Sequence, residues 1–279
     1  MYYIVQENVF RESHYNKLIE VMDRMGLEYK VVRIFPFVDK IVALDQIEHE
    51  HYNVDDLPEF TTDRKDVFVF GAIKLARISL DRGWNPGSLM NDNHDFLVYR
   101  EHYRENLLNW DSYITTFSAD IPWMDGERKF MRPCKDSKAF TGKSFSREDW
   151  RDFVTHHLNN GHTSVLDSNT EIQVSSVKRI YKEIRFWVVG GKIITGSQYR
   201  LGNQTIYDPN FDPDALDFAQ SMVDKFQLAE AFVIDVCLSE HGWKIVECGC
   251  INCAGFYCSD LQKTLTALED FYDPSKISN

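Results

Sequence analysis

Two acidic residues near the end of the chain, Asp235 and Glu247, are the side chains best placed to do chemistry. They lie in two short apolar segments, residues 231–238 and 243–247, which a short polar turn separates. A three-residue loop closed by Gly242 would place the carboxylates opposite each other, with their Cβ atoms ~5 Å apart. Like charges repel at that distance, so the pattern favours a cation between them, and Mg²⁺ is the hard cation that prefers oxygen ligands.

The same three-residue loop fixes the neighbouring pairs, and it predicts Ser239 opposite Trp243 and Cys237 opposite Ile245. A turn with an even number of residues would instead leave one carboxylate in solvent, and the turn sequence permits both registers. Asn252 follows the end of the second strand and is a candidate third oxygen ligand.

The composition describes a globular chain with a substantial core. Its 279 residues are 43% hydrophobic and 14% aromatic, enough for one large domain or two small ones. Apolar stretches are shorter than the roughly 20 residues of a membrane span and the N-terminus lacks an export pattern, so we expect a cytoplasmic protein without a membrane partner. A formal net charge of −12 argues against general nucleic-acid binding, because phosphate backbones require clustered positive charge. The sequence does not indicate the oligomeric state.

Four of the six cysteines fall within residues 248–258, which raises the possibility of a zinc or iron–sulfur site. Structural zinc sites usually space their ligands as two separated pairs, whereas these four are crowded together with apolar residues. We therefore expect reduced, mostly buried thiols. The cysteines in question are Cys248, Cys250, Cys253 and Cys258.

The first third of the chain alternates strands and helices. Apolar residues 3–5, an amphipathic helix near residues 15–25 and a strand at residues 29–34 form a β-α-β unit, which favours a parallel sheet. A second strand and helix follow within residues 67–80, and segment 84–95, rich in Asn, Pro, Gly and Asp, is the expected boundary. The predicted fold is mixed α/β, with domains at residues 1–95 and 96–279.

Positive charge is concentrated at residues 128–143, where a short strand ends at a proline and a basic loop follows. Arg132 could grip phosphate oxygens with its planar guanidinium and Lys138 could reach in as a point charge. Residues 137–144 are also one substitution away from a P-loop motif. That motif requires a helix to begin at its Lys-Ser pair, and Ser144 and Phe145 are predicted to be extended.

Residues 181–189 and 192–200 flank Gly190-Gly191, a strong signal for a β-hairpin with a two-residue turn. This register predicts a charged face and an apolar face, with Ile184, Phe186, Val188, Ile193 and Tyr199 on the apolar face. Gly196 opposite Arg185 would leave room for a ligand. The predicted pairs are Val189 with Lys192, Arg185 with Gly196, Glu183 with Gln198, and Tyr181 with Arg200. Just upstream, residues 171–177 form an apolar strand suited to an adenine ring, which needs an apolar slot and backbone polar groups.

Four features in chain order resemble the ATP-grasp superfamily. They are the basic strand and loop, the apolar strand at residues 171–177 (the hinge strand), the arginine-bearing hairpin and the acidic pair. More narrowly they resemble its phage-enriched branch named for an arginine and two lysines. The resemblance covers residues 124–258, and it is carried by residues 130–133, 138–142, 183–188, 196–200, 247 and 252–257. It implies two lobes around a nucleotide cleft, preceded by a small domain to which the first ninety residues are loosely similar.

The resemblance also implies a role for each candidate residue, with ATP and Mg²⁺ as cofactors. The implied nucleotide contacts are Lys129, Arg132, Lys138 and Glu183, with Ser175, Ser176 and Val177 around the adenine. The implied catalytic residues are Arg185, Arg200 and Lys138, and the implied metal ligands are Asp235, Glu247 and Asn252. Members of the branch commonly carry Glu-x-Asn, whereas Gly249 stands there in this chain, so the number of metal ions is open. The second lysine is also open among Lys129, Lys135 and Lys143.

The implied chemistry is ATP-dependent ligation, in which a carboxylate attacks the γ-phosphate and an amine or similar nucleophile then displaces phosphate from the acyl phosphate. Charge stabilisation by Mg²⁺, arginine and lysine serves this reaction without a protein nucleophile. The substrates, whether small molecule, amino acid or peptide, are not indicated. Two other classes stay open. One is a metal-dependent hydrolase or nuclease that uses Asp235 and Glu247, and the other is an interaction module that binds metal through the cysteine cluster.

Overall fold

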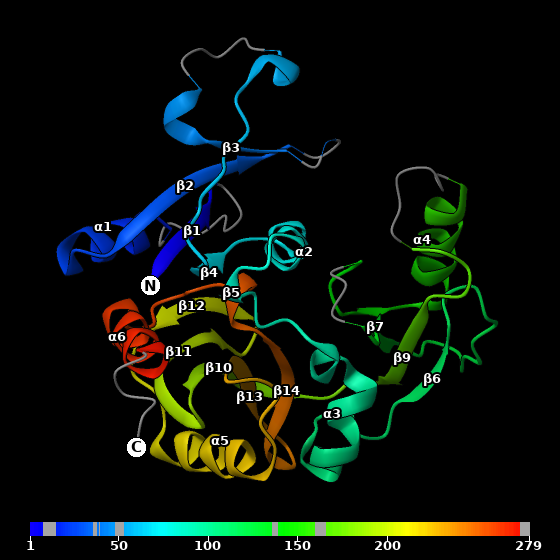
Figure 1. The fold of residues 1–279 in the computed structure, drawn as a ribbon. Helices are drawn as coiled ribbons and strands as arrows, with labels where there is room; N and C mark the ends of the chain where they lie inside the picture. The colour runs from blue at the N-terminus through cyan, green and yellow to red at the C-terminus, as the bar shows by residue number, and fades with distance from the viewer. Residues whose placement is uncertain are drawn as a thin grey trace.

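The computed structural model describes residues 1–7, 15–35, 38, 40–47, 53–135, 139–159 and 166–273. They contain an N-terminal five-stranded sheet, a four-stranded sheet and a larger five-stranded sheet (Figure 1). This is the mixed α/β fold that the sequence predicts. No helix in these ranges has the length and apolar character needed to cross a membrane.

The N-terminal sheet has the order β3-β2-β1-β4-β5, and β1 runs parallel to β2 and β4 as predicted. Residues 3–5 are buried because both faces of this sheet are covered, which is typical of parallel sheets. Gly26 closes the first helix with φ +65°, a conformation that favours glycine. The elements are β1 (Tyr2–Gln6), α1 (Tyr15–Met25), β2 (Glu28–Ile34), β3 (Ile41–Ala43), β4 (Asp66–Phe70), α2 (Ile73–Asp81) and β5 (Asn85–Gly87).

The four-stranded antiparallel sheet has the order β6-β9-β7-β8 and, together with α4, forms a small lobe (Figure 1). Met131, Phe145 and Val174 point to α4 and pack around Trp150. Because side chains alternate along a strand, Phe130 and Arg132 point to the opposite face. The elements are β6 (Tyr113–Thr116), β7 (Lys129–Pro133), β8 (Lys143–Phe145), α4 (Arg147–Asn159) and β9 (Glu171–Ser176).

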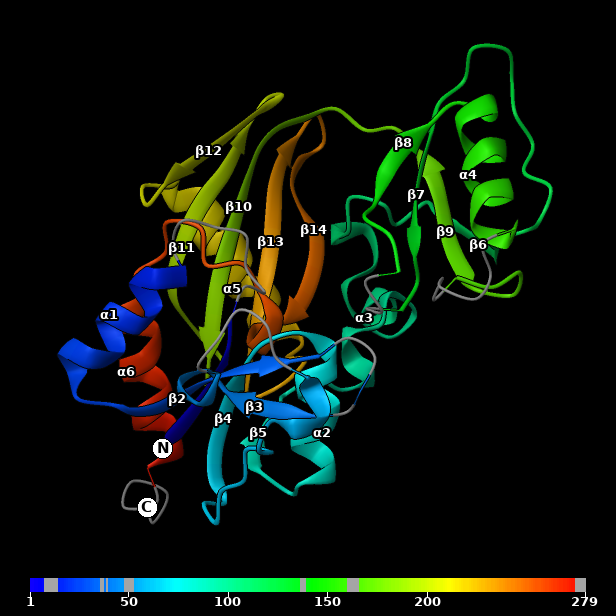
Figure 2. The same ribbon diagram turned by 90° about the horizontal axis from the view of Figure 1, so that it is seen from above.

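The large antiparallel sheet has the order β12-β11-β10-β13-β14, and the chain reaches it by crossing from β9 to β10 (Figure 2). One face is apolar and is covered by α5 and α3, with Phe186, Ile234 and Val223 among the packed side chains. The elements are α3 (Phe96–Tyr103), β10 (Ile180–Val189), β11 (Lys192–Leu201), β12 (Gln204–Asp208), α5 (Pro213–Lys225), β13 (Ala231–Ser239), β14 (Gly242–Cys250) and α6 (Leu261–Tyr272).

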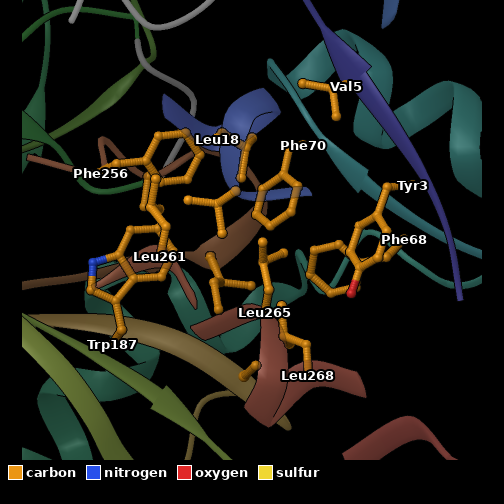
Figure 3. Packing of buried hydrophobic residues seen from close by; sticks show 14 of the residues in the cluster. Tyr3, Val5, Leu18, Phe68, Phe70, Trp187, Phe256, Leu261, Leu265 and Leu268 are labelled. Atoms are coloured by element: carbon orange, nitrogen blue, oxygen red, sulfur yellow. The ribbon is translucent and has the colours of Figure 1, made fainter. Parts of the chain in front are cut away.

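The other face of the large sheet changes from apolar to charged along the length of its strands. Toward one end, Trp187 and Val233 pack against α6 and the N-terminal sheet (Figure 3). The rings of Trp187 and Phe256 stack there with centroids 5.5 Å apart. Two residues away along the same strands, the side chains change to Arg185 and Asp235. The core therefore ends where the charged residues begin, and it holds their strands rigidly.

Candidate active site

The acidic pair lies on the charged end of this face. Asp235 on β13 and Glu247 on β14 are directly paired, so both side chains project to the same side of the sheet. The sequence predicts this juxtaposition, but it arises by another route. Ser239 pairs with Gly242, so the turn contains two residues and not three, and Val246 forms a β-bulge that brings the two carboxylates back into line.

Between the turn and the bulge, the pairing is shifted by one residue from the prediction. Gly242 does take the left-handed conformation, with φ +82°. The local turn residues were therefore interpreted correctly, whereas the loop length was wrong. The observed pairs are Leu238 with Trp243 and Cys237 with Lys244, in place of Ser239 with Trp243 and Cys237 with Ile245.

Arg185 on β10 neutralises Asp235. Its Nε and Nη2 atoms donate to the two carboxylate oxygens, each at 2.8 Å, and Nη2 lies 3.9 Å from Glu247. Burial raises the pKa of Asp235, and the guanidinium of Arg185 opposes this shift. Since Asp235 is only 2% exposed, loss of Arg185 would leave a buried charge without compensation. The geometry therefore makes Arg185 the group that holds Asp235 in place.

The β10–β11 hairpin brings Glu183 and Tyr199 to the same face. The Tyr199 hydroxyl donates to Glu183 at 2.6 Å and lies 3.3 Å from an oxygen of Asp235. The predicted position of Tyr199 on the apolar face is wrong, because two bulges interrupt the ladder. The pair Val189 with Lys192 is confirmed. Beyond it the observed pairs are Phe186 with Gly196, Arg185 with Ser197, Ile184 with Gln198, and Glu183 with Arg200, and the other three predicted pairs are wrong.

The space expected beside Gly196 is filled by protein. A Cβ atom at this position would lie 2.6 Å from the ring of Phe186, so no ligand fits there. Arg200 instead reaches the charged face, where its Nη1 donates to Glu183 at 2.6 Å. Its side chain is 42% exposed, so it is accessible to a bound molecule.

A cavity of about 480 Å³ lies between the small lobe and the large sheet, within the size range of ligand pockets. A smaller cavity of about 180 Å³ shares Arg132, Gly142 and Glu247 with it and extends to Lys135. The walls come from both lobes and from the segments that connect them. They include Phe130, Arg132, Thr141, Gly142 and Ser144 of the small lobe, Glu183, Tyr199, Arg200 and Glu247 of the large sheet, and Leu108, Asn109, Val177 and Lys178 of the connections.

Arg132 spans the cleft between the lobes. Its Nη1 lies 2.6 Å from a carboxylate oxygen of Glu247, so β7 and β14 are joined by an ion pair. Together with the pair of Arg185 and Asp235, this contact places two guanidinium groups and two carboxylates next to each other. Opposite charges thus alternate across the cleft. The guanidinium groups could bind an anion there, and the carboxylates could bind a cation.

The hinge strand leads into this cavity, but its residues differ in orientation. Val177 lines the cavity and is 51% exposed. Ser175 is buried and donates to the side chain of Asn109 at 3.1 Å, and Ser176 contacts Asp111 at 3.3 Å. The serine side chains therefore anchor the strand to the 109–111 segment.

Sequence reasoning missed several cavity residues, among them Leu108, Asn109 and Lys178. Lys178 follows the hinge strand, and its ammonium group donates to Asp111 at 2.6 Å. The first two precede β6 and contact strands far along the chain, because Asn109 accepts from Ser175 of β9 and the Leu108 N–H donates to Ile245 of β14. No local motif marks them, although the position of Lys178 beside a predicted adenine-binding strand was a usable signal.

The candidate lysines are distributed over both faces of the small lobe. Lys129 donates to Glu127 at 2.7 Å and alternates with the cavity residue Phe130, so it points to the opposite face of the strand, away from the cavity where the nucleotide contact was predicted. Lys143 is among the residues that line the larger cavity, but its ammonium group lies 4.8 Å from the Phe145 ring centroid. Lys135 lines the smaller cavity. Lys138 lies outside the described residues.

Two motifs in the sequence do not become sites. The Lys-Ser pair of the near P-loop motif lies in strand β8 and not at the start of a helix, so that interpretation is wrong. The cysteines between residues 248 and 258 form no disulfide. Among the described residues, no three side chains of His, Cys, Asp or Glu are grouped to hold a metal ion. The cysteine-cluster metal site is therefore not formed.

Asn252 is directed away from the acidic pair. Its Oδ1 accepts from the backbone N–H of Leu89 at 2.8 Å, and its Nδ2 donates to the carbonyls of Val69 and Gly87 at 2.7 and 3.2 Å. Its own carbonyl accepts from Gly71. The structure thus uses Asn252 to join the end of β14 to the N-terminal sheet.

The two carboxylates nevertheless fit a hard divalent cation that binds together with phosphates. Both side chains offer carboxylate oxygens, and Glu247 is 32% exposed at the cavity wall. Asp235 is 2% exposed and both of its oxygens accept from Arg185, so it would bind a cation only in exchange for one of these bonds. Mg²⁺ is usually held by one or two carboxylates, with substrate phosphates and water completing the shell. A third protein ligand is therefore not required.

A family model matches residues 50–268, and it describes an ATP-grasp domain, family 3 of the clade named for an arginine and two lysines. Solved structures with a similar fold include a D-alanine–D-alanine ligase from Bacillus anthracis, at 12% identity and a TM-score of 0.51, covering 99% of this chain and 94% of that chain. They also include D-cycloserine synthetase DcsG, at 10% and 0.53, covering 96% and 98%. A RimK domain ATP-grasp protein from Sphaerobacter thermophilus is similar at 12% and 0.56, covering 98% and 97%. No curated protein matches the sequence.

Proposed function

We infer function from family and geometry together: the chain belongs to the third family of ATP-grasp domains in the clade named for an arginine and two lysines, and we propose that it is an ATP-dependent carboxylate–amine ligase. The observation that carries the proposal is the ion pair of Arg132 with Glu247 across the cleft, beside Asp235. It brings a phosphate-binding type of side chain to within reach of two carboxylates suited to Mg²⁺.

We propose that the nucleotide occupies the larger cavity, with its adenine near Val177 and its phosphates toward Arg132. The phosphates would draw Arg132 away from Glu247, because a guanidinium binds phosphate oxygens in a bidentate manner. Glu247 and Asp235 would then hold Mg²⁺. When bound, the metal supplies positive charge to the phosphate oxygens during transfer.

The remaining charges serve the two steps of ligation. Arg132 and Arg200 line the cavity and would stabilise negative charge as a substrate carboxylate attacks the γ-phosphate. An amine would then displace phosphate from the acyl phosphate. Arg185 donates to both oxygens of Asp235 and so orients it, and we assign it a positioning role. Among structures with this fold, one is a D-alanine–D-alanine ligase, and only the ligase class is carried over to this chain.

The hydrolase or nuclease alternative uses the same carboxylates but does not need a cavity sized for a nucleoside. We propose a thermal-shift titration with ATP and MgCl₂ to separate the two, because a hydrolase without an ATP site would show no stabilisation. ADP release is then measured with a panel of amino acids and peptides, and hydroxylamine is added to trap an acyl phosphate.

Two variants test the acidic pair. Asp235→Asn and Glu247→Gln should abolish ADP release while the circular dichroism spectrum is retained. Glu240→Gln is the matched control, because Glu240 lies at the tip of the same hairpin and is 46% exposed. Normal turnover in both test variants would refute the role of the pair.

A further inference from the structure

We propose that Cys250 and Cys253 are a reversible dithiol–disulfide pair, a modification site separate from ligation. The two residues form a Cys-Ile-Asn-Cys sequence at the end of β14. This spacing is typical of redox-active pairs that cycle between dithiol and disulfide. The four cysteines are not grouped as a metal site. Exchange between dithiol and disulfide is the chemistry that this spacing leaves to Cys250 and Cys253.

The backbone brings the two thiols together. Ile251–Cys253 is a 3-10 helix with Cys250 as its N-cap. Side chains three residues apart eclipse each other in a 3-10 helix, with a rise of about 6 Å along the axis, which is within the Cα separation of a disulfide. The Cys253 Sγ folds back to 3.7 Å from the carbonyl oxygen of Cys250. The Cys250 Sγ donates to the Oδ1 of Asn252, the residue inside the same turn, at 3.2 Å.

The exposures of the two thiols differ in the way that such a pair requires. Cys253 is partly exposed, whereas Cys250 is 1% exposed and lies behind it. A small-molecule disulfide can therefore reach Cys253 first. Cys250 is then in place to resolve the mixed disulfide, because the 3-10 turn folds Cys253 back onto the backbone of Cys250.

The exchange balances with a small-molecule disulfide as oxidant. The Cys253 thiolate attacks one sulfur of the small disulfide, and one small thiol leaves. Cys250 then attacks the Cys253 sulfur, the second small thiol leaves and the protein disulfide closes. The protein loses two hydrogen atoms, and the small disulfide is reduced to two thiols.

The location gives the exchange a structural consequence. Asn252 lies between the two cysteines, and its side chain binds the backbone of Val69, Gly87 and Leu89. A disulfide would close a ring around the residue that joins the N-terminal sheet to β14. The oxidised protein should therefore keep its fold, and the disulfide should hold the 3-10 turn in one conformation.

The test oxidises the full-length folded protein with oxidised glutathione, blocks free thiols with an alkylating reagent and digests with trypsin. Cleavage after Lys244 and Lys263 places all four cysteines of the cluster on one peptide. This peptide should lose two hydrogen atoms, with only Cys248 and Cys258 alkylated. Fragment ions should be missing between Cys250 and Cys253 alone, and a dithiol should reverse the change.

Three variants assign the roles. Cys253→Ser should give no disulfide, and Cys250→Ser should accumulate one glutathione on Cys253. Cys258→Ser is the matched control and should oxidise as the wild type does. The proposal is overturned if the folded wild-type protein forms no disulfide or forms it between other cysteines. This mapping uses the wild-type chain, so the result stands even if a variant fails to fold.

Discussion

Replacing Asn252 with alanine separates a structural role from a metal-binding role. The side chain is 1% exposed and makes three hydrogen bonds to backbone groups, those of Leu89, Val69 and Gly87. The alanine variant would leave one N–H donor and two carbonyl acceptors without these partners. Each net hydrogen bond is worth about 1 kcal/mol and each buried unsatisfied group costs about 1–3 kcal/mol, so we expect a loss of about 3–5 kcal/mol.

The measurement is the thermal midpoint of the purified protein without nucleotide. A loss of this size should lower the midpoint by roughly 6–20 °C, given about 2–4 °C per kcal/mol for chains of this length. Asn203→Ala is the matched control, because Asn203 is exposed in the turn after β11. Its midpoint should change little, since exposed substitutions usually fall within about 0.5 kcal/mol.

A metal-binding role for Asn252 predicts the opposite pattern. The midpoint without nucleotide would then match that of the wild type, and the MgCl₂ concentration needed for half-maximal ADP release would rise. That outcome would refute the structural assignment. A lowered midpoint with an unchanged Mg²⁺ requirement would support it.

Three further outcomes are expected. Arg132→Met should raise the KM for ATP by about 10–100-fold through loss of charged hydrogen bonds, whereas Lys129→Met should leave it unchanged, and equal effects in steady-state ADP release would contradict the assigned orientations. Trp187→Ala should cost about 3–5 kcal/mol in denaturant unfolding, because the ring is fully buried, and a loss below about 1 kcal/mol would count against the packing. Gly196→Ala should cost about 1–3 kcal/mol in the same assay, because its Cβ meets the Phe186 ring, and a variant as stable as wild type would show that this ring moves freely.

Local sequence determined most of the elements and the turns between them. The helix at Tyr15–Met25 is marked by its apolar period and by Gly26, and the β10–β11 turn by Gly190-Gly191. These signals act over a few residues, because they depend on backbone preferences and on the alternation of side chains. The order of the charged segments along the chain was likewise enough to indicate the fold.

Tertiary structure decided which charged side chains meet. The bulges that align Asp235 with Glu247 and turn Tyr199 toward Glu183 interrupt the pairing within the strands, and the loop residues do not specify them. Asn252 finds its partners 163 to 183 residues away. The face to which Lys129 points depends on which side of the small lobe α4 covers. Such contacts join segments that are distant in sequence, so local preference names the residues while the packed core selects their neighbours.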